Sequence, residues 1–178
     1  MEVGQPYGSL AGNAGFLLSR VGTAVQTGFK EVLGRWRVRP LQFAILMTLS
    51  SAGEASQQQL CQVLGIDSGN MVELVDGLET LGYARRRRDP GDRRRYLLAL
   101  TEPGRAAFAA MTEAVDDYTV RFLEPLGQAE QAALVAALAK LFAATPEGRR
   151  MHRPPEPVKP EPVKPEPVKP EPVRTEQR

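Results

Sequence analysis

The sequence predicts a mainly α-helical (α+β) domain followed by a proline-rich tail, and three observations indicate this fold class. Apolar residues recur at helical spacing through most of the first 144 residues. Arginine-rich segments flank a proline–glycine turn near the middle of the chain. Ten of the 15 prolines lie at or after Pro146. We therefore expect a flexible N-terminus over 1–11, one folded domain over 12–145 and a disordered tail over 146–178, which holds repeats of Glu-Pro-Val-Lys-Pro.

Two helices are predicted at the start of the domain. Apolar side chains recur every three or four residues from Phe16 to Leu33, which predicts a helix over about 12–34. Pro40 suits the first turn of a second helix, because an N–H at that position would have no partner within the helix. This helix ends at Gly53 and is short and mostly apolar, so we expect it to be buried.

A third and a fourth helix follow, each with a recognisable cap. Ser56 and Gln59 form a capping-box pattern, which opens a helix that ends at Gly65. Asp67 is a suitable N-cap for the next helix, which Gly82 ends. This fourth helix has one apolar stripe that we expect to face the core, formed by Met71, Leu74, Val75 and Leu78.

A two-stranded β-ribbon and two further helices complete the predicted domain. Segments 83–88 and 95–100 flank the turn-forming residues 89–92, and the second segment has the apolar pattern of a strand. Thr101 is expected to cap a long helix, and a last helix covers about 128–144. Because the first and last helices have wide apolar surfaces, we expect them to form the interface of a homodimer.

Positive charge is concentrated in the ribbon. Residues 85–95 contain seven arginines and two aspartates, whereas the rest of 1–145 is net negative and the whole chain is +2. Such an arginine-rich turn fits the minor groove of double-stranded DNA, where the negative potential is strong. A solvated loop is the alternative interpretation, but it does not explain so many arginines in an otherwise acidic domain.

The remaining composition excludes several classes of protein. Cys61 is the single cysteine and His152 the single histidine, so the chain has no intramolecular disulfide, no zinc cage and no histidine-based triad. We expect no enzyme activity, no cofactor and no metal. Cys61 is expected to be a structural thiol, with redox sensing as the alternative. No apolar run is long enough to span a membrane and no signal peptide is evident, which predicts a cytoplasmic protein.

The element order is that of a winged helix-turn-helix domain, and the ribbon, or wing, resembles that of the MarR family of transcriptional regulators. The family pattern is Asp-x-Arg, an apolar strand and Leu-Thr, and it is matched by Asp92, Arg94, Leu100 and Thr101. The resemblance extends over about 12–144. It implies a ligand-responsive homodimeric repressor that binds a pseudo-palindromic operator.

The candidate DNA-binding residues lie on the wing and on the fourth helix. On the wing they are Arg86, Arg88, Asp92, Arg93, Arg94 and Arg95. On the helix they are Ser68, Gly69, Asn70 and Glu73. The helix has no basic residue; Asn70 suits adenine and Glu73 suits the amino group of cytosine. We therefore expect the wing to supply most of the affinity for DNA and the helix to recognise a small number of bases.

A small-molecule effector is implied by the resemblance alone. Bulky or cationic residues near the junction of the first two helices are its candidate site, namely Phe16, Arg20, Trp36, Phe43 and Met47. Core packing is the alternative for each of them. A different function is also open: a winged-helix module that binds a protein through its acidic fourth helix, with the proline-rich tail as a tether and weak or no specific DNA binding.

Overall fold

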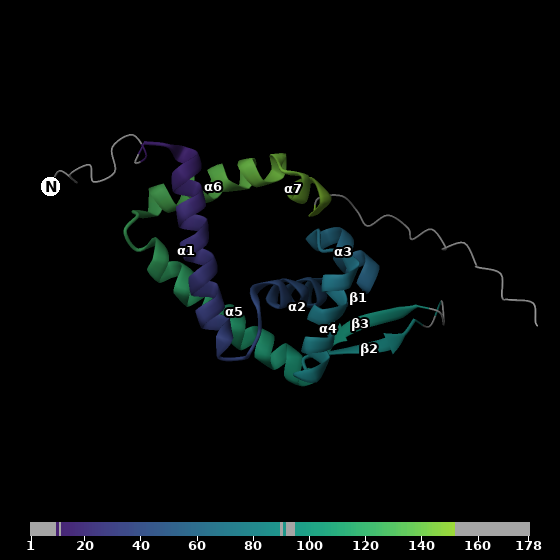
Figure 1. Ribbon diagram of the computed structural model, residues 1–178. Coiled ribbons are helices and arrows are strands. Elements are labelled where there is room, and N and C mark those ends of the chain that lie inside the picture. Colours follow the sequence, from purple (N-terminus) through teal and green to yellow (C-terminus); the bar gives the residue numbers. More distant parts are fainter. Residues whose placement is uncertain (1–9, 11, 90, 92–94, 152–178) are drawn as a thin grey trace, which may run out of the picture.

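The computed structural model of the chain describes residues 10, 12–89, 91 and 95–151. Its elements, in chain order, are α1 (Ala14–Gly34), α2 (Pro40–Ala52), β1 (Glu54–Ser56), α3 (Gln57–Leu64), α4 (Ser68–Thr80), β2 (Ala84–Arg88), β3 (Tyr96–Leu100), α5 (Glu102–Leu123), α6 (Gln128–Ala144) and α7 (Pro146–Met151). The short helix α2 lies in the middle, with α1 and α5 to one side and α3, α4 and the strands to the other (Figure 1). The predicted winged helix-turn-helix architecture is confirmed.

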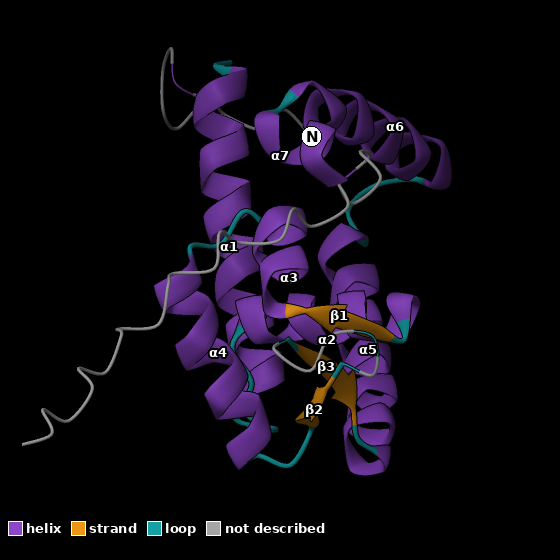
Figure 2. Ribbon diagram, turned by 90° about the vertical axis from the view of Figure 1, so that its right-hand side faces the viewer, coloured by secondary structure: helices purple, strands orange, loops and turns teal. Residues whose placement is uncertain are grey.

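The sheet is antiparallel and has three strands in the order β1-β3-β2. In the wing, Arg85 pairs with Ala99 and Arg87 with Leu97. β2 contacts α4 and β3 contacts α5, so the sheet lies against both helices (Figure 2). The expectation of a two-stranded ribbon missed β1, which pairs Glu54 with Ala99 on the other edge of β3. Three residues are too few to show strand periodicity, and the last of them, Ser56, is also a helix cap.

The predicted helix caps are confirmed. The Ser56 hydroxyl accepts a hydrogen bond from the backbone N–H of Gln59 at 3.2 Å, and the Gln59 side chain accepts one from the N–H of Ser56 at 2.8 Å. Asp67 accepts from the N–H of Asn70 at 2.9 Å. Thr101 accepts from the N–H of a helical glycine at 2.9 Å, which fixes the direction in which α5 leaves the wing.

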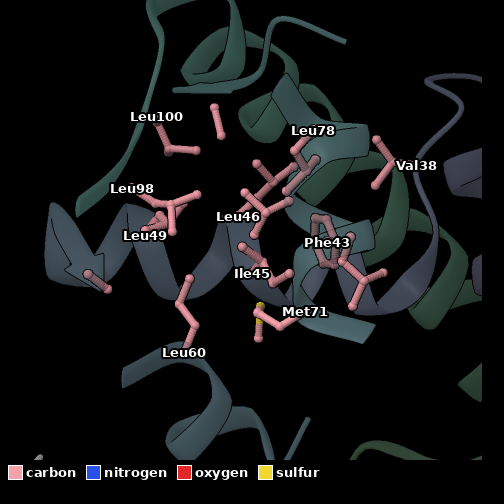
Figure 3. Packing of buried hydrophobic residues seen from close by; sticks show 14 of the residues in the cluster. Val38, Phe43, Ile45, Leu46, Leu49, Leu60, Met71, Leu78, Leu98 and Leu100 are labelled. Atoms are coloured by element: carbon pink, nitrogen blue, oxygen red, sulfur yellow. The ribbon is translucent and has the colours of Figure 1, made fainter. Parts of the chain in front are cut away.

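The hydrophobic core surrounds α2. Ile45, Leu46 and Leu49 of α2 are at most 1% exposed. They meet side chains from α3, α4 and β3 (Figure 3), which include Leu60, Met71, Leu78, Leu98 and Leu100. Phe43 of α2 packs against Phe108 of α5 with their rings tilted and ring centroids 5.5 Å apart. The elements on both sides of α2, with α1 and α5 on one side and α3, α4 and the strands on the other, therefore bury apolar surface against this short helix. No helix in the described ranges is long and apolar enough to cross a membrane.

Gln42 is a buried polar side chain within this core and joins α2 to α4. It is 3% exposed. Its Oε1 accepts from the backbone N–H of Arg39 at 2.9 Å, and its Nε2 donates to the carbonyl of Leu74 at 3.1 Å. A Cβ atom on Gly77 would lie 2.6 Å from this Nε2. The absence of a side chain at Gly77 therefore lets the amide reach α4.

Two helices carry apolar surface that the described part of the chain leaves uncovered. On α1, Phe16, Leu17 and Val21 are exposed, and their fractional exposures range from 37 to 49%. On α6 no residue is buried, and its exposed apolar side chains are Val135, Leu138, Leu141 and Phe142. These are the two helices that the sequence assigned to a dimer interface.

The expectation that the chain beyond residue 145 does not pack is wrong for 146–151, which form α7. The Thr145 hydroxyl accepts from the N–H of Gly148 at 3.0 Å, and Pro146 occupies the first turn, where proline is tolerated. α7 contacts α3 as well as α6. The proline repeats and the expected flexible N-terminus lie outside the described residues, except for position 10.

We predict that Gln42→Met lowers the free energy of unfolding by about 1–3 kcal/mol, because the substitution leaves a partly buried N–H without its acceptor. Urea denaturation followed by circular dichroism measures the change. Gln62→Met, at an exposed position of α3, is the matched control and should change the stability little. Equal stability of the two variants would contradict this assignment for Gln42.

Candidate nucleic-acid interface

The four arginines of β2 divide between the two faces of the sheet. Successive side chains of a strand point to opposite faces, so Arg86 and Arg88 share one face and Arg85 and Arg87 share the other. Arg85 and Arg88 are exposed, whereas Arg86 and Arg87 are half-buried. The run of arginines is therefore not one uniform cationic surface.

Arg86 faces α4 and forms ion pairs there. Its Nη1 lies 2.7 Å from Oδ1 of Asp76, and it also contacts the carboxylate of Glu79. The backbone N–H of Arg86 donates to Glu79 at 2.8 Å. The sequence assigned Arg86 to DNA, but its guanidinium is occupied within the domain, because strand alternation turns it toward two acidic residues one turn apart on α4. It joins the wing to α4.

Arg87 faces the opposite way and joins the two edge strands. Its Nε lies 2.6 Å from Oε1 of Glu54 on β1, and its Nη2 contacts the other carboxylate oxygen, so the pair is bidentate. The hydrogen bond from Arg87 lowers the pKa of Glu54 and raises that of Arg87. This pair spans β3 and stiffens the base of the wing.

The tip of the wing is described in part. The N–H of Asp89 donates to the carbonyl of Arg95 at 2.9 Å, which extends the ladder by one pair. The Asp89 side chain accepts from the N–H of Gly91 at 2.8 Å. Asp92, Arg93 and Arg94 lie outside the described residues. Of the predicted wing contacts, the structure thus describes Arg86, Arg88 and Arg95.

The outward face of α4 holds all four residues predicted to read DNA. Ser68, Gly69, Asn70 and Glu73 are exposed. The predicted inward stripe is confirmed, since its four residues, Met71, Leu74, Val75 and Leu78, are at most 1% exposed.

The acidic side chains of α4 have arginine partners from elsewhere in the chain. Oε1 of Glu73 lies 3.0 Å from Nη2 of Arg39, the residue that precedes α2. Asp76 and Glu79 share Arg86. Sequence reasoning missed the pairing of Arg39 with Glu73, because 34 positions separate the two residues and no local pattern connects them.

The five predicted effector residues do not form one site within a single chain. Phe16 and Arg20 lie in the first two turns of α1, whereas Trp36 follows its last turn. At a rise of about 1.5 Å per residue, the helix separates Phe16 from Trp36 by roughly 30 Å. Phe43 is buried against α5, and Met47 is 48% exposed.

A depression of about 640 Å³ lies instead between the end of α2 and α5. Its lining is Ser50, Arg105, Phe108, Ala109, Thr112, Glu113, Asp116 and Asp117. Three carboxylates and one arginine are among these lining residues. None of the five predicted effector residues lines it. Asp116 and Asp117 are adjacent in the sequence, and a pair of adjacent acids indicates no binding site by itself.

Cys61 has the character of an unreactive thiol. It is partly buried in α3. Burial, with a smaller contribution from the negative charge of Asp67, raises its pKa. The reactive thiolate is therefore disfavoured at neutral pH, which agrees with a structural thiol.

Comparisons with known proteins agree with this geometry. The model of the MarR family matches residues 38–95. A protein of Thauera aromatica, named as a transcriptional regulatory protein for the hcr operon, is 32% identical over 76% of this chain and 82% of its own length. The chain belongs to the MarR family of transcriptional regulators. The matched segment runs from just before α2 through β2 to residue 95, which is most of the winged helix-turn-helix and stops just before β3.

Solved structures of the family extend the likeness to the flanking helices. The transcriptional repressor CouR, bound to a 23-mer DNA duplex, superposes with a TM-score of 0.70 at 32% identity, covering 75% of this chain and 95% of that one. CouR from Rhodococcus jostii RHA1, bound to p-coumaroyl-CoA, gives a TM-score of 0.67 at 30% identity, covering 78% and 98%. The fold prediction is thus confirmed for the helices on both sides of the wing.

We predict that the Glu54–Arg87 pair stabilises the domain at pH values above 4.5, the ordinary pKa of a glutamate. At pH values well below 4.5 this stabilisation should be absent. The folded state lowers this pKa, so the contribution is fully present above about 4.5 and is lost as the pH falls through the lower, folded value. Thermal melts from pH 3 to 7 should show Glu54→Gln less stable than the wild type near neutrality, with a difference that shrinks in acid.

Glu113→Gln, at an exposed position of α5, is the control for the loss of one carboxylate. A stability difference for Glu54→Gln that stays the same at every pH would contradict the assignment of this ion pair.

Proposed function

We propose that two copies of this chain form a cytoplasmic repressor that binds a pseudo-palindromic operator in double-stranded DNA. The observation that carries the proposal is the exposed face of α4 beside a wing in which Arg85 and Arg88 are exposed. Two basic wings on one dimer match two half-sites. A spacing of about 34–36 Å between them follows from the two-fold symmetry.

We assign phosphate and minor-groove contacts to the wing. Arg85 and Arg88 are exposed and make no ion pair with another residue of the described ranges. Arg93, Arg94 and Arg95 belong to the same segment, and Asp92 is assigned to steady one of these arginines. Guanidinium groups suit phosphate oxygens and narrow minor grooves. Arg86 acts with them indirectly, since its ion pairs hold the wing against α4.

We assign base recognition to the N-terminal half of α4. Ser68, Gly69, Asn70 and Glu73 lie on its exposed face. An asparagine pairs with adenine through two hydrogen bonds, and a glutamate accepts from the amino group of cytosine. Gly69 has no side chain, which lets the helix backbone approach the bases closely.

We also propose that a small molecule weakens DNA binding. The support is that CouR, with the same fold, was solved both on DNA and with p-coumaroyl-CoA. The depression between α2 and α5 supports a site at the junction between the reading elements and the long helices. Phe43 packs directly behind it against Phe108. The other four predicted effector residues do not line this depression, so they contact the small molecule from a second chain or have another role. They are Phe16, Arg20, Trp36 and Met47.

We predict that the full chain binds DNA from its own promoter region with a steep salt dependence. Each phosphate neutralised lowers the slope of log K against log salt by about 0.9. Fluorescence polarisation at several salt concentrations should give a steep slope for the wild type and a slope shallower by about 0.9 per wing for Arg88→Gln.

Arg121→Gln, in the last turn of α5, removes the same charge far from the wing and should leave the slope unchanged. A wild-type protein with no salt dependence, or with no preference over an unrelated duplex, would overturn the proposed function. That result would favour a protein-interaction module.

A further inference from the structure

The reading face of α4 presents a carboxylate where DNA would be. Glu73 is exposed and carries a charge of the same sign as the phosphates. Its partner is Arg39, whose Nη2 lies 3.0 Å from Oε1 of Glu73. The side chains of Arg39 and Glu73 are 52% and 71% exposed. Exposed pairs of this kind are weak and are screened by salt, so phosphate groups can compete for the arginine.

The other ion pairs of α4 have a different character. Arg86 contacts two carboxylates, those of Asp76 and Glu79, and its own side chain is 26% exposed. Its backbone N–H is also bonded to Glu79. Because the strand and the side chain are both held, Arg86 remains on α4 when DNA binds. Arg39 has one such partner among the described residues, so it is the exchangeable cation.

Gln42 fixes the positions of Arg39 and Glu73 relative to each other. The same amide side chain binds the backbone N–H of Arg39 and the carbonyl of Leu74, which follows Glu73 in the chain. Gln42 is 3% exposed and its amide lies over Gly77, so it has little freedom to move. The meeting of Arg39 with Glu73 is therefore built into the packing of α2 on α4.

We propose that Arg39 determines the base preference of α4 by covering or releasing the carboxylate of Glu73, with Gln42 as the positioning residue. The inference rests on the proposed function. While Arg39 covers Glu73, the carboxylate neither repels phosphate nor accepts from cytosine. When Arg39 transfers to a DNA phosphate, Glu73 is free to accept from a cytosine amino group. Covered and released states thus differ in both affinity and selectivity.

The test is a selection from a pool of synthetic duplexes with randomised centres, followed by sequencing of the bound fraction. The full-length chain is used as wild type, Arg39→Gln, Glu73→Gln and the double variant. Arg39→Gln should lower the overall affinity about 2- to 5-fold, since the uncovered carboxylate repels phosphate. It should also increase the enrichment of cytosine at one half-site position. Glu73→Gln should abolish that enrichment, by about 5-fold or more.

The double variant decides the mechanism. It should show the preference of Glu73→Gln, because Arg39 acts on base choice through Glu73 alone. If Arg39→Gln shifts the preference equally with and without Glu73, or not at all, the inference is overturned and Arg39 is a plain phosphate contact. Arg35→Gln is the matched control, at an exposed position on the connection between α1 and α2 that also holds Arg39, and should leave the preference unchanged. Thermal melts verify that every variant is folded.

The two proposals fail in different ways. A wild-type chain that enriches no sequence overturns the proposed function and this inference together. If the wild-type chain enriches a defined half-site and Glu73→Gln shows the same cytosine preference as the wild type, this inference alone is overturned.

Discussion

The packing of α1, α3, α4, α5 and the sheet on α2 is the constraint on which the structure depends. This helix is too short to be stable alone and is apolar on all sides, so it exists because α1, α3, α4, α5 and the sheet cover it. Gln42 adds directional hydrogen bonds to this apolar packing. Its hydrogen bonds allow one register between α2 and α4, because any slip would leave a buried amide unpaired. The position of the exposed face of α4 follows from the buried side chain of Gln42.

Ion pairs between α4 and nearby arginines determine the charge of the surface. An acidic helix that approaches DNA would be repelled, yet each acidic residue of α4 from Glu73 onward is paired with an arginine, either Arg39 just before α2 or Arg86 of β2. The arginine run of the wing consequently divides into structural and free members. Arg86 and Arg87 hold α4 and β1 against β2, while Arg85 and Arg88 remain exposed. A count of charges along the sequence overstates the positive charge that is available to DNA.

The long helices give the domain its partner surfaces. α1 and α5 pack through aromatic contacts, where Tyr118 lies edge-on to Phe29 at 5.6 Å and occupies the space that a side chain at Gly28 would fill. The outer faces of α1 and α6 stay apolar and exposed, which is costly in water unless a second surface covers them. The depression between α2 and α5 lies where this half meets the reading half. A change of packing there would reach α4 through the same helix, α2.

Local interactions account for what the sequence determined by itself. Caps act over three residues and helical stripes over one or two turns, so the four N-terminal helices, the wing and the MarR pattern were predictable from local signals, which include the apolar spacing of the first helix, Pro40, Ser56, Asp67 and Thr101. Tertiary structure decided the rest, because contacts between distant residues leave no local pattern. The strand β1 is defined by its pairing to β3, Arg86 is directed inward by its place on the strand, and Arg39 meets Glu73 across 34 positions. The predicted effector residues do not form one site for the same reason, since the length of α1 separates Phe16 from Trp36 and the packing of α2 on α5 buries Phe43.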